Sequence, residues 1–169
     1  MPRKAVQEVL EAQMSSFMPR GSILLIEAKD LLATPAGTTK TWNKVTEHNR
    51  SALELAPERI EKVVRTSDGT LRKIFVADKR KFQLSWDMLP SYRTLTVDGG
   101  WGAEDLRSFY FSDDGRQSFN IRINLAKTGL DQSTSGYESY NVVISSANFS
   151  VVKRGLQPHW TVSLELDEV

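Results

Sequence analysis

Four stretches in the second half of the chain alternate apolar with polar residues: FQLSWD at 82–87, FNIRINL at 119–125, YNVVI at 140–144 and WTVSLEL at 160–166. In the first of them Phe82, Leu84 and Trp86 occupy every second position. Successive side chains of a strand point to opposite faces, so each stretch presents one apolar face to a core and one polar face outward. The spacing therefore predicts a mainly β fold, a β-sandwich or barrel of antiparallel strands.

A hairpin is predicted just before the first of these stretches. Two apolar runs at 60–66 and 71–77 flank Ser67, Asp68 and Gly69. Asp-Gly between two runs rich in β-branched residues is the strongest short-range hairpin signal. Asp78 and Lys79 are interpreted as a second turn that leads into a strand at 80–88, so residues 59–88 are predicted to form an antiparallel meander.

The remaining segments set the predicted domain organisation. Residues 101–111 place Leu106 and Phe109 near one helical face and predict one short helix. Apolar residues at three- and four-residue spacings within 3–16 predict a helix, which either packs on its own domain or binds a partner. Residues 29–57 follow no period. We therefore predict an N-terminal helical segment at 1–20 and a single β-sandwich domain at 21–169 with a long loop at 29–57.

The composition limits which functions are plausible. The chain has 169 residues, close to the size of one ordinary domain, and it lacks cysteine, which excludes disulfides and thiolate metal sites. Its 22 basic and 21 acidic residues give a net charge of +1, so no general attraction to nucleic acid or to anionic membranes is expected. No apolar run is long enough for a membrane span or a signal peptide.

Few residues suit catalysis. His48 and His159 are the two histidines, and neither has a partner at the spacing of a metal site or a catalytic triad. The glycine-rich segment at 98–102 opens a helix but matches no nucleotide-binding motif, so it is interpreted as a turn capped by Asp98. We therefore predict no catalytic, cofactor-binding or metal site and no enzyme activity; a hydrolase that uses carboxylates with His48 is the weakest alternative.

Charges of opposite sign gather in two strands. Residues 58–81 contain eight basic and four acidic residues, while Glu165, Asp167 and Glu168 lie in the last strand. Opposite charges on two strand surfaces of one chain suit a self-complementary, head-to-tail contact between copies. The alternative interpretation is ordinary solubilising charge.

From about Asn49 to Val169, roughly two thirds of the chain, the sequence resembles small virion proteins from the tails of long-tailed bacteriophages, particularly those of actinobacterial hosts. The resemblance rests on the order and spacing of short motifs: HNR at 48–50, RIE at 59–61, DGTLR at 68–72, FQLSW at 82–86, LPS at 89–91, VDG at 97–99, FS at 149–150, KRG at 153–155 and LELDEV at 164–169.

This resemblance implies a fold and a place in the particle. Tail-tube proteins of this kind are β-sandwiches with one short helix and a long loop, and they assemble into hexameric rings that stack around a lumen for DNA. The likeness implies that residues 29–57 are the loop that reaches the adjacent ring and that residues 101–111 are the helix. The N-terminal helical segment leaves open a tube-end, tail-tip or connector protein in place of the main tube subunit.

We therefore predict a structural virion protein of a phage tail, assembled in the host cytoplasm, that associates with itself and with other tail proteins. DNA is expected only as non-specific cargo of the lumen. The alternative is a free-standing β-sandwich that binds carbohydrate or peptide, for which Trp42 is the candidate exposed aromatic residue. The residues predicted to form subunit interfaces are Trp42, His48, Asn49, Arg50, Arg72, Lys73, Arg80, Glu165 and Asp167.

Overall fold

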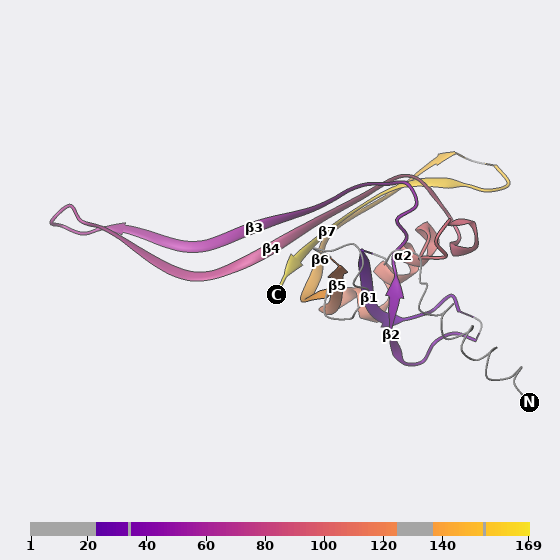
Figure 1. Cartoon of the computed structure of the whole chain (residues 1–169), viewed down its shortest axis with the longest axis horizontal. Coiled ribbons are helices and arrows are strands. Elements are labelled where there is room, and N and C mark those ends of the chain that lie inside the picture. Colours follow the sequence, from indigo (N-terminus) through magenta and orange to yellow (C-terminus); the bar gives the residue numbers. More distant parts are fainter. Residues whose placement is uncertain (1–22, 34, 125–136, 154) are drawn as a thin grey trace, which may run out of the picture.

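The computed structural model describes residues 23–33, 35–124, 137–153 and 155–169. Within these ranges a body built from short and long strands carries one long two-stranded hairpin that projects from it (Figure 1). The predicted N-terminal helical segment at 1–20 lies outside the described residues.

Seven strands form one sheet in which every neighbouring pair is antiparallel. The strands run in the order β2-β1-β5-β6-β7-β4-β3. Their bounds are β1 (Leu24–Lys29), β2 (Lys40–Lys44), β3 (Arg50–Arg65), β4 (Leu71–Pro90), β5 (Phe119–Asn124), β6 (Tyr137–Lys153) and β7 (His159–Glu168). The prediction of a mainly β, antiparallel fold is confirmed.

The core is built by the alternating stretches that the sequence marks. The inward residues of β4, β5 and β7 are almost completely buried, as are Tyr140 and Val142 of β6. The aromatic rings of Phe82 and Tyr140 lie 5.1 Å apart between centroids. Since fully burying a large apolar side chain contributes roughly 1.5 to 3 kcal/mol, these alternating positions supply most of the drive to fold.

The sheet wraps around this core. Thr46, directly after the edge strand β2, accepts a hydrogen bond at 2.9 Å from the indole Nε1 of Trp86 in β4, although the two strands are far apart in the strand order. Val45 forms an isolated parallel bridge with Trp101, which precedes the main helix. The sandwich-like body is therefore made by one curled sheet.

Three helical segments close one side of the body: η1 (Arg93–Leu95), α2 (Ala103–Phe111) and α3 (Asp113–Arg116). Asp105 caps the start of α2 because its carboxylate accepts a hydrogen bond at 3.0 Å from the backbone of Gly102. Phe109 of α2 packs edge-on against Phe119 of β5 with centroids 4.9 Å apart. The predicted short helix is confirmed, and it packs on the core as its apolar face indicates.

The hairpin turn is confirmed, but the predicted meander is wrong. Gly69 has a φ of 85°, which a glycine adopts without strain, between β3 and β4. No turn occurs at Asp78 and Lys79, because β4 continues through both residues and pairs them with Arg59 and Glu58 of β3. A charged dipeptide without glycine or proline does not force a turn, and polar side chains are tolerated on a strand that is open to water.

The predicted loop at 29–57 is shorter than expected. It contains β2 and the first half of β3. The sequence pattern of β2 is misleading because its inward residue is polar: Asn43 is buried and donates hydrogen bonds to the carbonyls of Ala28 and Thr41 at 2.8 and 2.9 Å. Pro57 is compatible with β3 because β3 is a sheet edge, where the missing N–H faces no neighbour.

Candidate assembly surfaces

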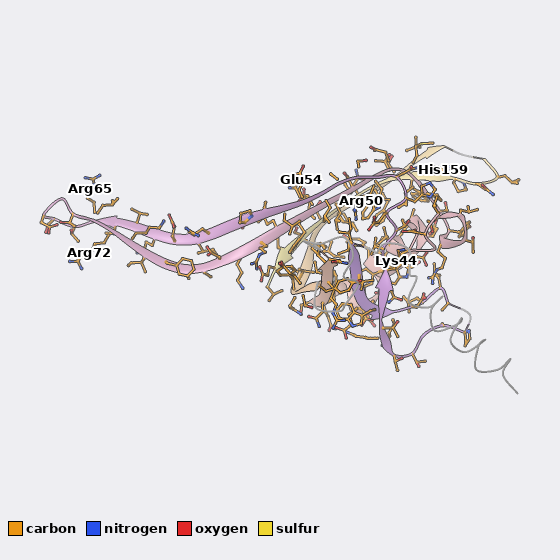
Figure 2. The ribbon with its side chains drawn as sticks, in the orientation of Figure 1. Lys44, Arg50, Glu54, Arg65, Arg72 and His159 are labelled. Carbon is orange, nitrogen blue, oxygen red and sulfur yellow. The ribbon has the colours of Figure 1, made fainter. Side chains whose placement is uncertain are left out.

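Residues 57–80 form an arm that leaves the body. From Lys81 to Trp86 β4 is paired with both β3 and β7, whereas in residues 71–80 its partner among the described strands is β3. Figure 2 shows Arg65 and Arg72 near the tip, far from the body, and Glu54 and Arg50 where β3 runs along it. The arm is thus a two-stranded ribbon that no other described strand covers on either face.

Large apolar side chains are exposed along this arm. Ile60, Val63, Val64, Leu71, Ile74, Phe75 and Val76 are 38 to 63% exposed. A two-stranded ribbon has no core of its own in which to bury them, and an isolated hairpin of this kind is marginal in water. Such a surface in a folded protein indicates a contact with another molecule.

The tip of the arm is held in one conformation by its own hydrogen bonds. Asp68 accepts hydrogen bonds from the Thr66 hydroxyl and, at 3.0 Å, from the backbone N–H of Thr70. The Thr66 hydroxyl bond, followed by the Thr70 bond, holds the pKa of Asp68 below its ordinary value. Gly69 donates to the carbonyl of Thr66 at 2.9 Å.

The root of the arm is fixed to the body by charged side chains. Arg80 lies 3.5 Å from the carboxylate of Glu168, and Lys79 donates to the carbonyl of Val169 at 2.6 Å. Lys81 pairs with Glu58 at 3.1 Å, and this contact, together with Asp167 and Glu165, raises the pKa of Lys81. The end of β7 therefore braces the place where the arm begins.

These contacts bear on the prediction that opposite charges of β4 and β7 meet between copies of the chain. Arg80 lies in β4, whereas Glu165 and Asp167 lie in β7, and β4 and β7 are neighbours in the same sheet. In the isolated chain Arg80 meets Glu168, and Asp167 is paired in register with Lys81, so opposite charges of β4 and β7 already meet within one molecule. A part for Arg80, Glu165 and Asp167 in subunit contacts stays a prediction.

Arg72 and Lys73 lie on the distal half of the arm, as a surface role requires. The Nζ atom of Lys73 is 2.5 Å from the carboxylate of Glu61 on the opposite strand. Arg72 forms no ion pair within the described part of the chain. Arg72 is therefore free to meet a carboxylate of another molecule.

The predicted interface residues of the segment before β3 are held mainly by contacts within the chain. His48 accepts a hydrogen bond at its Nδ1 atom from the backbone of Val97 at 3.3 Å. Asn49, with a φ of 55°, donates to the carbonyl of Met88 at 3.0 Å. Arg50 is half-buried, 4.0 Å from Glu47.

Trp42, the remaining residue of the predicted set, lies in the edge strand β2. It is half-buried, and the guanidinium of Arg122 lies over its ring at 4.0 Å from the centroid. This cation–π contact covers one face of the ring, so Trp42 is a weaker candidate for stacking on a sugar than the sequence indicates. Among the described strands β2 pairs with β1 alone, so its other edge has no strand partner there.

Two register rows on the outward face of the four long strands consist mainly of polar side chains. One register row across β3, β4, β7 and β6 reads Glu54, Gln83, Glu165 and Ser146, and the next reads Ala52, Ser85, Ser163 and Asn148. Glu54 and Glu165 are exposed, and neither forms an ion pair with a described residue. The first of these rows therefore carries two carboxylates outside any ion pair, while the row on its other side contains Lys81 beside Asp167 and ends at the exposed Val143.

A charged cluster ties the loop after β1 to the helical side of the body. Arg93 contacts both oxygens of Asp30 at 2.6 and 2.7 Å and also binds Asp105 of α2. The Arg93 hydrogen bond holds the pKa of Asp30 below its ordinary value. Beside this cluster a very small pocket lies between Leu31, Leu32 and Phe109. This cluster of Asp30, Arg93 and Asp105 therefore holds the loop after β1 against the helical side of the body.

Asp98 caps the turn before α2, as the sequence predicts. It accepts hydrogen bonds from the Thr46 hydroxyl at 2.6 Å, from the backbone of Glu47 at 3.0 Å and from the backbone of Gly100 at 3.1 Å. Burial acts to raise the pKa of Asp98, but these three hydrogen bonds outweigh it, so the pKa lies below its ordinary value. The turn is thereby attached to the segment after β2.

In the described ranges no group of three or more histidine and carboxylate side chains is arranged to hold a metal ion. The helices described above are also too short to cross a membrane.

The residues that the sequence reasoning missed are the apolar ones of the arm, above all Leu71, Ile74 and Phe75. Two signals point to them. Phe75 and Val76 follow Ile74 directly, so apolar residues occupy both faces of one strand, and residues 71–88 contain no glycine or proline that would end the strand. A strand of this length exceeds the usual three to ten residues and must run beyond its sheet.

The sequence matches no protein-family model and no curated protein. Solved structures are nevertheless similar in fold. One is a chain from the tail of an empty gene transfer agent particle, computed with helical refinement and C6 symmetry: it aligns with a TM-score of 0.51 and 13% identity over 88% of this chain and 92% of that chain. Another, from the virion of a native gene transfer agent particle, aligns with a TM-score of 0.50 and 12% identity over the same shares. The chain therefore has the fold of proteins found in phage-like tail particles.

Proposed function

We propose that this protein is a structural subunit of a phage-like tail, and that copies of it form rings which build or cap the tube through which DNA passes. The fold shared with chains of gene transfer agent particles supports a place in such a tail. The C6 symmetry of one of those tails supports six copies in each ring. The subunit acts through assembly and carries out no reaction.

The observation that carries this proposal is the uncovered arm. Seven large apolar side chains face water over residues 60–76, and they lie far from the core of their own chain (Figure 2). A chain that works alone gains nothing from such a surface, whereas a subunit buries it on assembly. The two free edges of the sheet, β2 and β3, provide further backbone groups for contacts between neighbouring copies.

The outward face of β3, β4, β7 and β6 is the surface that suits the lumen. DNA is a dense polyanion, and lysine or arginine side chains that neutralise its phosphates make it adhere. The row that contains Glu54 and Glu165 offers carboxylates, hydroxyls and amides instead. A lumen with this lining repels DNA weakly and lets it pass.

The interface residues of the tube follow from these two surfaces. Arg72 and Lys73 of the arm face a copy in the next ring, while Trp42 on the β2 edge contacts a neighbour within the ring. The segment that joins these parts contains His48, Asn49 and Arg50. These residues contribute to the interface mainly by fixing the position of this segment.

The test is the mass of the purified full-length protein, measured by light scattering over a series of concentrations at low and high salt, followed by electron microscopy. A subunit of a tail tube is expected to form rings or tubes as the concentration rises. A protein that stays monomeric throughout, also when mixed with tail components from the same particle, would contradict the proposal.

A further inference from the structure

The distal arm carries apolar side chains on both of its faces. Directly paired residues of an antiparallel ribbon share a face, and consecutive residues alternate between faces. Glu61 with Phe75, Val63 with Lys73 and Arg65 with Leu71 form the first face of the arm. Lys62 with Ile74 and Val64 with Arg72 form the second face.

Both faces need a cover. Phe75 and Leu71 on the first face are 57 and 59% exposed, and Ile74 on the second face is 55% exposed. A partner that docks on one face of a ribbon leaves the other in water. Because neither face is polar throughout, one-sided docking leaves apolar surface unburied.

We propose that the arm is held between two further copies of this chain, one packed against each face. This inference rests on the proposed function, which supplies the copies, and it adds how the arm is bound. A single arm then joins three subunits, so each ring is tied to its neighbour at twice as many contacts as a one-sided arm provides.

The two faces require different surfaces from their neighbours. On the first face Lys73 is neutralised within the arm by Glu61 at 2.5 Å. On the second face neither Lys62 nor Arg72 forms an ion pair with a described residue. Arg65 on the first face is likewise outside any ion pair of the described residues, so the second face carries two unpaired cations and the first face one. The contact on the second face therefore depends more on carboxylates of the neighbouring copy and weakens more with salt.

The charge of the chain supports a copy of itself as the occupant. Residues 57–80 contain seven basic and four acidic residues, a net charge of +3. The whole chain contains 22 basic and 21 acidic residues, so the rest contains 15 and 17, a net charge of −2. The arm of one copy and the body of another thus attract each other, and the contact is heterologous, as stacked rings require.

Two adjacent residues of β4 allow a matched experiment. Phe75→Thr removes an apolar side chain from the first face, and Ile74→Thr removes one from the second. Phe75 and Ile74 are almost equally exposed, and the threonine that replaces them favours strands. Val97→Thr makes the same kind of change at an exposed position in the body, and we expect it to assemble like the wild type. Thermal unfolding of each variant checks that the monomer is intact.

Both arm variants are expected to raise the concentration needed for assembly by roughly tenfold or more, because each loses the burial of a large apolar side chain. Arg72→Gln is expected to raise the concentration needed for assembly at low salt and to make that concentration less dependent on salt. If either Phe75→Thr or Ile74→Thr assembles at the wild-type concentration, the arm is covered on one face and the inference is wrong. A wild-type protein that never assembles overturns the proposed function itself, and the inference with it.

Discussion

Arg80 of β4 lies over the ring of Tyr140 of β6, with its Cζ atom 4.9 Å from the ring centroid. Its guanidinium is also 3.5 Å from the carboxylate of Glu168 in β7. The arm therefore starts from a residue that is anchored on two further strands, and the body sets the direction in which the arm points. An arm that bridges subunits needs such a fixed root, because a freely swinging ribbon loses more conformational entropy on binding.

The same tyrosine gives a pH prediction. Burial, followed by the hydrogen bond to Glu138, raises the pKa of Tyr140 to about 12. The pKa in the unfolded chain is about 10, so the contribution to stability is complete below about pH 10 and is lost as the pH rises toward 12. We expect the phenolate absorbance of the Tyr140→Phe variant to lack the last ionisation step of the wild type, and its stability to decline less over this range. Equal declines would contradict the assignment.

The ion pair of Asp30 and Arg93 is expected to stabilise the body. Asp30→Asn removes a carboxylate that contacts Arg93 through both oxygens, and the loss is expected to be about 1 to 3 kcal/mol at neutral pH. The pKa of Asp30 is lowered in the folded protein, so its contribution is present above the ordinary value of about 3.9 and is lost as the pH falls through the folded value. Urea unfolding of both proteins at neutral and acidic pH should show a difference that narrows in acid. A difference that is independent of pH would exclude this charge as the cause.

Trp86 is expected to be the most sensitive core position. It is fully buried, and its indole N–H donates to the carbonyl of Thr46 at 2.9 Å. Trp86→Ala opens a cavity and leaves that carbonyl without its donor, at a cost of about 3 to 5 kcal/mol, a large part of the roughly 5 to 15 kcal/mol that keeps a typical domain folded. Circular dichroism checks this, with Trp86→Phe as the milder control. A folded Trp86→Ala protein with an unchanged melting temperature would contradict the described core.

The acidic outward face is expected to keep DNA from adhering inside the assembly. Glu54→Lys combined with Glu165→Lys reverses both carboxylate charges of one register row. We expect wild-type assemblies to sediment without DNA and the double variant to retain DNA in a salt-dependent way. Gln83→Ser in the same row, which changes no charge, is the control. If the double variant retains no more DNA than the wild type, this face does not line the lumen.

The extent to which the fold could be predicted depends on where the polar residues point. In β5 the apolar residues Phe119, Ile121 and Ile123 face inward between polar neighbours, as the alternation in the sequence predicts. The strand β2 escapes prediction because Asn43 faces inward and is satisfied by backbone carbonyls, a tertiary arrangement that no local pattern encodes. Local spacing identifies a strand when its inward residues are apolar and fails when they are polar.

The candidate assembly surface was only partly predictable for a related reason. The turn at Asp68 and Gly69 and the basic character of Arg72 and Lys73 are visible in the sequence. The projection of the arm from the body is not visible in the sequence, because no local pattern indicates that β4 runs past the end of β7. Exposure of residues such as Ile74 follows from that geometry, and an apolar residue in a strand is otherwise assigned to a core.

The measurement that tests the central claim most directly is a comparison of the full-length protein with a variant in which residues 58–79 are replaced by an Asn-Gly turn between Pro57 and Arg80. Both are examined by light scattering and electron microscopy at matched concentrations. The account predicts rings or tubes for the full-length protein and a folded monomer with nearly the same melting temperature for the variant, because the arm contributes no residue to the core. Rings or tubes of the shortened variant, formed at the same concentration as those of the full-length protein, would show that the arm does not hold the assembly together.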